Sequence, residues 1–579
     1  FYTLLLYMPR DRYNTQVRQR VERIAMDYLG GIAIESQVQL SESILARVHM
    51  LVRTDPATSQ RADAATLQGL IEEAVRTWPD RFRQALEERL AEDVAATRFR
   101  RWGGAFPAAY HDDTAPGDAV ADVERLEALA ADPGQLVTGL YRRQGDPEHK
   151  VQFKVYRREL PIAISDVLPI LENLGLRLIS ERPYQLEAAG GPWWVQDFEL
   201  EPPRGVLIDL PSDGPRLTAT FTAVWAGRAD NDGFNRLVLA ADLDWREVTV
   251  LRSYARWFVQ LGLPLSQAYM EEALASNAAA AGHLARLFLA RFDPDLAPAA
   301  RARAEARHRE ALDELLAGIT RVDDDRIVRA FLAAIVATLR TSYFRTDGTG
   351  APRSYLALKL DPRAVPETPL PRPMFEIFMH SPRVEGVHLR MGKVARGGLR
   401  WSDRREDFRT EILGLMKAQN VKNTVIVPVG SKGGFVPRRL PAGREEALAE
   451  GTECYRLFIR SLLDVTDNLV DGKVAPPPRV VRKDGDDPYL VVAADKGTAS
   501  FSDVANAISA EYGFWLGDAF ASGGSAGYDH KKMGITARGG WEAVKRHFRE
   551  VGKDIQSEPF TVIGVGDMSG GVFGNGMLL

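Results

Sequence analysis

The chain has 579 residues, too many for one hydrophobic core, so we expect about three to five domains. With 45% hydrophobic and 26% charged residues and a formal net charge of -4, it has an ordinary globular composition that favours no nucleic-acid partner. The single cysteine, Cys454, excludes a disulfide framework and a cysteine metal cluster; we expect a cytoplasmic protein without a metal site. No apolar run reaches the about 18–20 residues that span a bilayer, so we expect no membrane contact.

The first segment predicts a small α+β unit. Alternating and periodic apolar residues predict the order strand, helix, strand, strand over residues 1–9, 14–30, 32–40 and 46–54. That order suggests a sandwich with helices on one face of a sheet. Residues 56–106 look mostly helical, and 112–119 predict a loop.

A second unit of the same element order is predicted from near Val137. It has strands at 149–158, 177–187 and 193–201 and a helix at 164–176, in which Ser165 and Gly175 are start and stop signals. The two units share element order and not residue identity, so the internal repeat is weak.

The rest of the chain divides at a proline-rich segment. Residues 230–341 predict helices, and the charged run 300–319 is typical of a solvated helix face. Residues 362–373, PRAVPETPLPRP, are interpreted as a linker because so many prolines prevent a continuous helix or central strand. Strands and helices then alternate, which indicates an α/β domain.

Three cations follow the linker, each beside small residues. RGGLRW places Arg396 and Arg400 on either side of two glycines, and a helix over 405–423 carries Lys422 at its end. A buried strand, TVIVP, is expected to open into a glycine-rich loop, GSKGG, with Lys432. Cations converging from Arg396, Lys422 and Lys432 suit a dicarboxylate.

Two other interpretations of PVGSKGGF (428–435) remain open on its own residues. A phosphate loop needs Gly-Lys followed by Ser or Thr at a helix start, whereas Ser431 precedes the lysine here. A plain turn with a solvent-facing lysine is the other alternative.

An acidic residue ends a second strand. PYLVVAA leads to Asp495, and ligands of α/β sheets bind beyond the carboxyl ends of strands. Ser500 and Asp503 form a helix-start signature. A further glycine-rich loop precedes a helix expected to begin near Thr536, whose hydroxyl is a candidate ligand contact.

The last segment predicts a strand, FTVIGVG, followed by Gly564, Gly566 and the pair Ser569–Gly570 before a helix. Strand, glycines and helix in this order hold a dinucleotide pyrophosphate at a helix N-terminus. The acidic residue that reads the ribose is expected about 20 residues further on, past Leu579, so the residues do not separate NAD from NADP. We expect the chain to be a piece of a larger protein and unable to turn over by itself.

Together and in this order, the motifs resemble glutamate dehydrogenase, specifically its large NAD-specific bacterial class. RGGLRW is similar to the family's substrate loop with arginine in place of lysine, and VKNTVIVPVGSKGG to its next two lysine motifs, with a shorter gap between the lysines than in the small hexameric enzymes. AADKG resembles the segment of the catalytic aspartate, ITARGG the cofactor-side threonine motif, and GVGDMSGG the dinucleotide turn. Residues 1–375 resemble, more diffusely, the class's long N-terminal extension.

The resemblance implies a role for each candidate. Lys432 would be the catalytic lysine, its pKa lowered by neighbouring cations and desolvation, and Asp495 the general acid/base. Lys422 would hold the α-carboxylate of the substrate. The side-chain carboxylate of glutamate or 2-oxoglutarate would be held by Arg396 with Gly397 and Gly398. NAD would be bound by Thr536, Gly564, Gly566, Asp567, Ser569 and Gly570.

The implied fold is a multidomain α+β and α/β chain: ACT-like β-α-β sandwiches, a helical region, the α/β substrate domain of a glutamate dehydrogenase and the first strand and turn of a Rossmann domain. The implied function is NAD-dependent oxidative deamination of L-glutamate to 2-oxoglutarate and ammonia by a homo-oligomer. The alternative is a regulatory and oligomerisation region whose ACT-like units bind an amino-acid effector. The expected domains are an ACT-like unit (1–55), a helical connector (56–136), a second ACT-like unit (137–232), a helical domain (233–345), a linker (346–374), the substrate and catalytic domain (375–555) and the start of the Rossmann domain (556–579).

Overall fold

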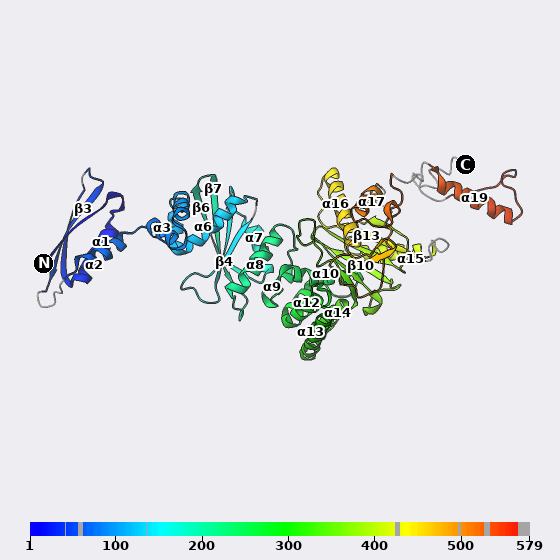
Figure 1. Cartoon of the computed structure of the whole chain (residues 1–579), viewed down its shortest axis with the longest axis horizontal. Helices are drawn as coiled ribbons and strands as arrows, with labels where there is room; N and C mark the ends of the chain where they lie inside the picture. The colour runs from blue at the N-terminus through cyan, green and yellow to red at the C-terminus, as the bar shows by residue number, and fades with distance from the viewer. Residues whose placement is uncertain are drawn as a thin grey trace. The chain divides into compact units, whose positions relative to one another are not determined.

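The computed structural model describes residues 1–40, 42–55, 62–134, 136–422, 429–495, 500–525 and 533–564 (Figure 1). The chain divides into two units, one of residues 1–164 and 178–201 and the other of 165–177 and 202–579. No helix in these described ranges is long and apolar enough to cross a bilayer.

The first unit begins with a three-stranded antiparallel sheet in the order β1-β3-β2, which confirms the predicted element order. Helix α1 starts where the Asn14 side chain accepts a hydrogen bond from the Val17 N–H (2.9 Å) and stops at Gly30, whose φ of 62° suits glycine. Its buried residues form one core with alternate residues of β3. The elements are β1 (Tyr2–Pro9), η1 (Arg10–Arg12), α1 (Thr15–Leu29), β2 (Gly31–Gln39), β3 (Leu45–Thr54) and α2 (Ala64–Val75).

Helices and a four-stranded sheet in the order β4-β5-β7-β6 complete this unit. The predicted loop 112–119 is wrong except at residues 114–115, because helix α5 extends to Asp113 and Pro116 opens helix α6, a position where its fixed φ and missing N–H cost nothing. Asp122 of α6 is buried and accepts hydrogen bonds from Lys154 Nζ and the Tyr156 hydroxyl of β5, both 2.6 Å, so helix and sheet are joined. The elements are α3 (Trp78–Arg89), α4 (Glu92–Trp102), α5 (Ala108–Asp113), α6 (Pro116–Ala131), β4 (Val137–Tyr141), β5 (Val151–Arg158), β6 (Arg177–Ala188) and β7 (Gly191–Glu201).

The second unit contains helices α7 (Ile164–Asn173) and α8 (Leu210–Trp225), which lie before the predicted helical region, residues 230–341. Helix α10 starts with a capping box between Asp244 and Glu247 and ends at Gly262. It packs against strand β10, where the Trp257 indole donates to Glu376 Oε1 (2.7 Å). The elements are α7 (Ile164–Asn173), α8 (Leu210–Trp225), η2 (Gly233–Arg236), α9 (Leu237–Ala240), α10 (Trp245–Leu261), α11 (Gln267–Ser276), α12 (Ala278–Phe292), α13 (Pro298–Gly318) and α14 (Val322–Ala337).

A seven-stranded mixed sheet in the order β16-β12-β13-β11-β10-β9-β8 lies next in this unit (Figure 1). From β8 to β13 neighbouring strands run antiparallel, whereas β12 runs parallel to both β13 and β16. The strands are β8 (Thr338–Thr341), β9 (Leu356–Leu360), β10 (Phe375–His380), β11 (Val384–Arg390), β12 (Gly398–Trp401), β13 (Ser431–Pro437) and β16 (Ala493–Ala494).

The expected linker 346–374 is wrong as a separator of domains, because it contains β9, which pairs with β10 in the same sheet. The prolines of 362–373 occupy only the crossing from one strand to the next, which begins with η3 (Pro362–Ala364). Proline lacks the N–H that a central strand donates, so the crossing is where these residues are tolerated.

Two helices cover opposite faces of the sheet near β13. Phe435 packs with Phe458 of α16, while Ile412 of α15 lies against Gly434 on the other face. As predicted, α15 extends to Lys422, with Phe408, Ile412 and Met416 buried. The remaining elements are α15 (Phe408–Lys422), α16 (Arg444–Leu463), β14 (Asn468–Val470), β15 (Lys473–Ala475), α17 (Ser502–Glu511), η4 (Gly517–Ala519) and α19 (Ile535–Glu550).

The predicted GSKGG loop is instead a buried strand, since residues 431–437 form β13. A Cβ at Gly433 would lie 2.3 Å from Leu399 Cδ2, and one at Gly434 would lie 2.4 Å from Ile412 Cδ1. These glycines therefore permit close packing of β13 against its neighbours and do not form a turn. The TVIVP strand, 424–428, lies outside the described residues.

Two further element predictions differ from the structure. Ser500 does not cap the next helix: α17 starts at Ser502, and Asp503 instead accepts hydrogen bonds from the N–H (2.7 Å) and hydroxyl of Ser525. The Asp503 carboxylate is therefore hydrogen-bonded to Ser525 in a neighbouring loop and not to the N–H groups at the start of α17. Residues 560–564 of the predicted FTVIGVG strand are not in a strand, and the continuation lies outside the described residues.

Candidate active site

The parallel strands bring Lys432 and Asp495 together. Strand β12 lies between β13 and β16, with Leu399 opposite Gly433 on one side and Gly398 opposite Ala493 on the other. Lys432 is the second residue of β13, and Asp495 directly follows β16. Lys432 Nζ lies 2.5 Å from Asp495 Oδ2, and the side chains are 5% and 24% exposed. A nearly buried ammonium beside a partly open carboxylate can exchange protons with a bound molecule.

Arg400, predicted only as a neighbour of the two glycines, contacts the same carboxylate. Its Nε lies 3.1 Å from Asp495 Oδ2, and Nη1 donates to Glu411 Oε1 of α15 (2.8 Å). The Ser402 hydroxyl donates to the other Glu411 oxygen (2.6 Å). Strand periodicity was the available signal, because residues two apart, such as Gly398 and Arg400, share a face.

Opposing effects set the ionisation of this chain of groups. Burial opposes the charge of Arg400, but the hydrogen bond to Glu411 and the charge of Asp495 outweigh it and raise its pKa. Burial likewise disfavours the Glu411 carboxylate, yet hydrogen bonds from Ser402 and Arg400 lower its pKa. Both groups are therefore ionised across the neutral range.

Gly397, directly before β12, allows an unusually close backbone approach. The Ser431 N–H donates to the Arg396 carbonyl (3.0 Å), and a Cβ on Gly397 would lie 1.5 Å from the Ser431 carbonyl oxygen. Backbone atoms cannot turn aside as a flexible side chain can. Only glycine at position 397 allows β12 and β13 to pair this closely, which places Lys432 of β13 beside β12.

We expect Gly397→Ala to destabilise the second unit by about 3 kcal/mol, the upper part of the range for overpacking. The change is measured by denaturant unfolding. Gly414→Ala is the matched control, because a Cβ there meets no atom within 4 Å on helix α15, where alanine is favoured. Equal unfolding midpoints for the two variants would contradict the close approach.

The other predicted residues are brought together only in part. The Arg396 backbone and Gly397 and Gly398 lie beside Lys432, and the Arg396 side chain is exposed. Lys422 is the last residue of α15, and its side chain lies outside what the structure describes. Their contacts with a substrate remain a prediction.

The predicted nucleotide-binding residues are mostly untested. Thr536 is exposed in the first turn of α19, which starts after Gly534. Gly564 is exposed and outside any helix or strand. Gly566, Asp567, Ser569 and Gly570 lie outside the described residues.

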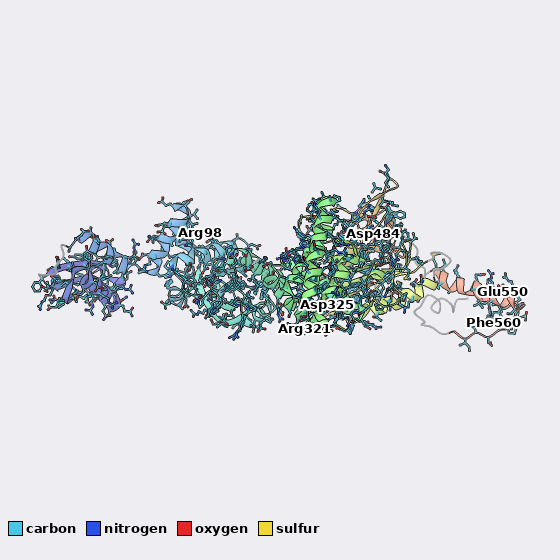
Figure 2. All side chains as sticks on the ribbon, turned by 90° about the horizontal axis from the view of Figure 1, so that it is seen from below. Arg98, Arg321, Asp325, Asp484, Glu550 and Phe560 are labelled. Carbon is cyan, nitrogen blue, oxygen red and sulfur yellow. The ribbon has the colours of Figure 1, made fainter. Side chains whose placement is uncertain are left out.

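A cluster of buried ionised side chains, called here the buried charge cluster, holds the segment that leads to Asp495. The Asp487 carboxylate accepts hydrogen bonds from Lys359 Nζ (2.7 Å) and from both terminal nitrogens of Arg390. Arg390 also donates to the Tyr489 carbonyl (2.7 Å). Burial opposes ionisation of Asp487, but Arg390 and Lys359 lower its pKa well below the usual range. The cluster consists of Arg340, Lys359, Arg390, Asp467, Asp484 and Asp487, of which Asp484 is labelled in Figure 2.

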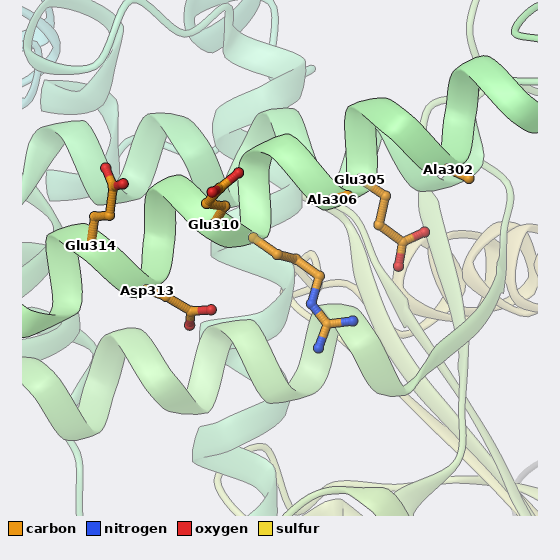
Figure 3. Close-up of a pocket in the computed structure, with 7 residues that line it drawn as sticks. Ala302, Glu305, Ala306, Glu310, Asp313 and Glu314 are labelled. Carbon is orange, nitrogen blue, oxygen red and sulfur yellow. The ribbon is translucent and has the colours of Figure 1, made fainter.

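A hollow of about 730 Å³ along α13 is not a candidate site. Figure 3 shows that its side chains come from one helix, and they include four carboxylates and one guanidinium. No second element faces them among the lining residues, which are Ala302, Glu305, Ala306, Arg309, Glu310, Asp313 and Glu314. This is the solvated helix face predicted for residues 300–319.

Family comparisons match the chain in five successive segments. The catalytic domain of bacterial NAD-glutamate dehydrogenase matches residues 311–579. Other parts of glutamate dehydrogenase match as the ACT2 domain (1–79), helical motif 2 (85–129), the ACT3 domain (135–212) and helical motif 3 (229–294).

Three curated relatives are similar along the whole chain, and each is named NAD-specific glutamate dehydrogenase. The Pseudomonas aeruginosa protein is 50% identical over 582 residues, covering 99% of this chain and 36% of its own length. The Halomonas elongata protein is 50% identical over 585 residues (100% and 36%), and the Mycobacterium tuberculosis protein is 47% identical over 607 residues (100% and 37%). The chain therefore spans little more than a third of the length of these relatives.

Proposed function

We propose, from the premise that this chain belongs to the family of bacterial NAD-specific glutamate dehydrogenases, that it carries the substrate side of their active site. The proposed reaction is the NAD-dependent oxidative deamination of L-glutamate to 2-oxoglutarate and ammonia. The observation that carries it is the 2.5 Å contact between Lys432 Nζ and Asp495 Oδ2 beside the glycines of β12.

Lys432 and Asp495 divide the proton chemistry in this proposal. Asp495 takes a proton from the substrate ammonium, so that the α-carbon can lose hydride. In its neutral amine form Lys432 then takes a proton from the water that attacks the iminium carbon, and the ammonium so formed stabilises the carbinolamine. Asp495 returns its proton to the amino group, which leaves as ammonia while the carbinolamine hydroxyl loses its proton to solvent and becomes the ketone. The 2.5 Å contact holds both groups at one point of the site.

The remaining candidates clamp the substrate. Lys422 binds the α-carboxylate, and Arg396 binds the side-chain carboxylate, with Gly397 and Gly398 giving the substrate room against the backbone. Two fixed carboxylates orient the α-carbon, which is what hydride transfer requires.

For NAD, the residues present fit a phosphate-bearing ligand in type. Thr536 lies in the first turn of α19, where backbone N–H groups have no partner within the helix. We propose that Thr536, Gly564, Gly566, Asp567, Ser569 and Gly570 hold the dinucleotide, the last five as the first turn of a Rossmann domain. NAD supplies the hydride acceptor.

The complete protein should form NADH from NAD only when L-glutamate is added, as measured by NADH absorbance. L-aspartate and L-glutamine are the matched controls, because each lacks the side-chain carboxylate at the position that Arg396 is proposed to hold. Turnover of all three at similar kcat/KM would contradict the assignment of substrate.

A regulatory role for the N-terminal unit is the second candidate. Phe1, directly before β1, and Leu5 and Tyr7 within it are 75%, 45% and 58% exposed, so β1 presents apolar side chains at its surface. This supports the proposal that the ACT domains bind an amino-acid effector or join subunits of a homo-oligomer. Added amino acids should then change the rate of NADH formation without being consumed.

We also propose a cytoplasmic location, as expected from the single cysteine.

A further inference from the structure

We propose that Arg400 and Glu411 form a positioning pair for Asp495, in which Glu411 balances the charge that Arg400 presents to the acid/base carboxylate. This inference rests on the proposed function. It adds two residues that act through Asp495 and fixes the pH range in which the Lys432–Asp495 pair works.

The sheet register places Arg400 for this task. Strand β12 is parallel to β16, so Arg400 extends alongside the residue that follows β16, which is Asp495. Asp495 Oδ2 thus has Lys432 Nζ at 2.5 Å and Arg400 Nε at 3.1 Å. A guanidinium held at both ends fixes the carboxylate more firmly than a lone lysine would.

Two cations on one oxygen also carry a chemical cost. They stabilise the carboxylate anion, and a strongly stabilised anion is a poor proton acceptor. Glu411 offsets this, because its carboxylate lies 2.8 Å from Arg400 Nη1. The Arg400 and Glu411 side chains are 19% and 15% exposed, so water only partly screens the pair. Arg400 can then orient Asp495 while Glu411 balances part of the charge that Arg400 carries.

Helix α15 and the loop before it supply the other charges near the pair. Ser402, itself buried, fixes one oxygen of Glu411 at 2.6 Å. Arg404 also acts on Glu411 through its charge, although its guanidinium is paired with Asp407. Among the described residues, the charged groups near the pair include Lys432 on β13, Arg400 on β12, Asp495 after β16, Glu411 on α15 and Arg404.

The test is the pH dependence of kcat/KM for glutamate oxidation by the complete protein, because a bell-shaped profile reports the ionisation of the free enzyme. In Glu411→Gln the charge of Arg400 is no longer balanced, so the acid limb should move to lower pH by about 0.5–1 unit. In Arg400→Gln one cation is lost, so the limb should move to higher pH by a similar amount, and kcat should fall by about 10–100-fold. The double variant should return the limb close to its original position.

The predicted direction of the acid-limb shift is the same whether that limb reports Asp495 alone or the coupled Lys432–Asp495 pair. Loss of the nearby Glu411 anion lowers the pKa of both groups. Arg400→Lys should retain the charge and recover part of the rate. Glu406→Gln is the matched control, since Glu406 is exposed on the same segment and makes the same change in net charge.

If the salt bridge between β12 and α15 is purely structural, Glu411→Gln and Arg400→Gln would lower kcat or the unfolding midpoint without moving the acid limb of the pH profile. Alternatively, both variants would move the acid limb in the same direction. Either result would overturn the inference. Ser402→Ala, a milder change that loosens Glu411, should shift the limb in the direction of Glu411→Gln and covers the case in which that variant does not fold. Absence of glutamate oxidation in the unaltered protein would instead refute the proposed function.

Discussion

Replacement of Lys432 by alanine in the complete protein is expected to lower kcat for glutamate oxidation by about a thousandfold, within the range for loss of a positioned acid–base group. Lys432 is nearly buried and lies 2.5 Å from Asp495, and the nearby Arg400 guanidinium does not readily exchange a proton as a lysine amine can. The substrate carboxylates are assigned to other residues, so KM should change much less than kcat. Steady-state NADH formation over a range of glutamate concentrations separates the two parameters.

Lys473→Ala provides the matched control, because Lys473 is an exposed lysine on β15, and its loss should leave kcat within a few fold. Primary amines such as ethylamine should restore part of the activity of Lys432→Ala by occupying the vacated space. If Lys432→Ala keeps a rate close to that of Lys473→Ala, the catalytic role of Lys432 is wrong.

Asp487→Ala is expected to destabilise the second unit by about 3–5 kcal/mol, the usual result when one partner of a buried ion pair is removed. The change leaves Arg390 and Lys359 in the buried charge cluster without their shared carboxylate. Denaturant unfolding followed by tryptophan fluorescence measures the loss. Asp486→Ala is the control: the Asp486 side chain is 60% exposed and pairs at the surface with Arg482, so its removal should cost at most about 1 kcal/mol.

The pH dependence of stability follows from the direction of the Asp487 shift. Its folded-state pKa is lowered, so the stabilisation is fully present above the unfolded-state value of about 3.9 and is lost as pH falls below it. The difference in unfolding free energy between the unaltered protein and Asp487→Ala should therefore be constant near neutrality and narrow in acid. A constant difference down to strongly acidic pH would contradict the assigned shift.

Local signals in the sequence predicted the elements whose ends are set by neighbouring residues. Helix α1 is the clearest case, since Asn14 and Gly30 cap it through contacts within a few residues. The candidate pair Lys432 and Asp495 also came from local motifs, together with a family resemblance. The structure confirms that the two side chains meet, while their roles stay predictions.

Features that depend on distant partners were not accessible in this way. Residues 431–437 look like a loop because glycine is the strongest local turn signal, yet Leu399 and Ile412 require those glycines in a strand. Strand β9 was assigned to a linker because its pairing with β10 spans a proline-rich crossing. Strand periodicity places Arg400 on the same face as Gly398, but it does not identify Asp495, 95 residues further on, as the partner of Arg400.

The two-residue strand β16 affects when the site forms during folding and when it is lost during unfolding. Parallel pairing of β12 with β13 and β16 joins segments that are far apart in sequence. The conformational entropy of the intervening chain is lost before the strand contacts form, so we expect these pairings to be slow steps of folding. A short edge strand is also among the first elements to open from the native state. Lys432, Arg400 and Asp495 meet only after that edge has docked, so we expect the proposed acid–base centre to be assembled late and to be lost first. Inactivation should accordingly precede global unfolding, and activity should be a more sensitive indicator of correct folding than helix content.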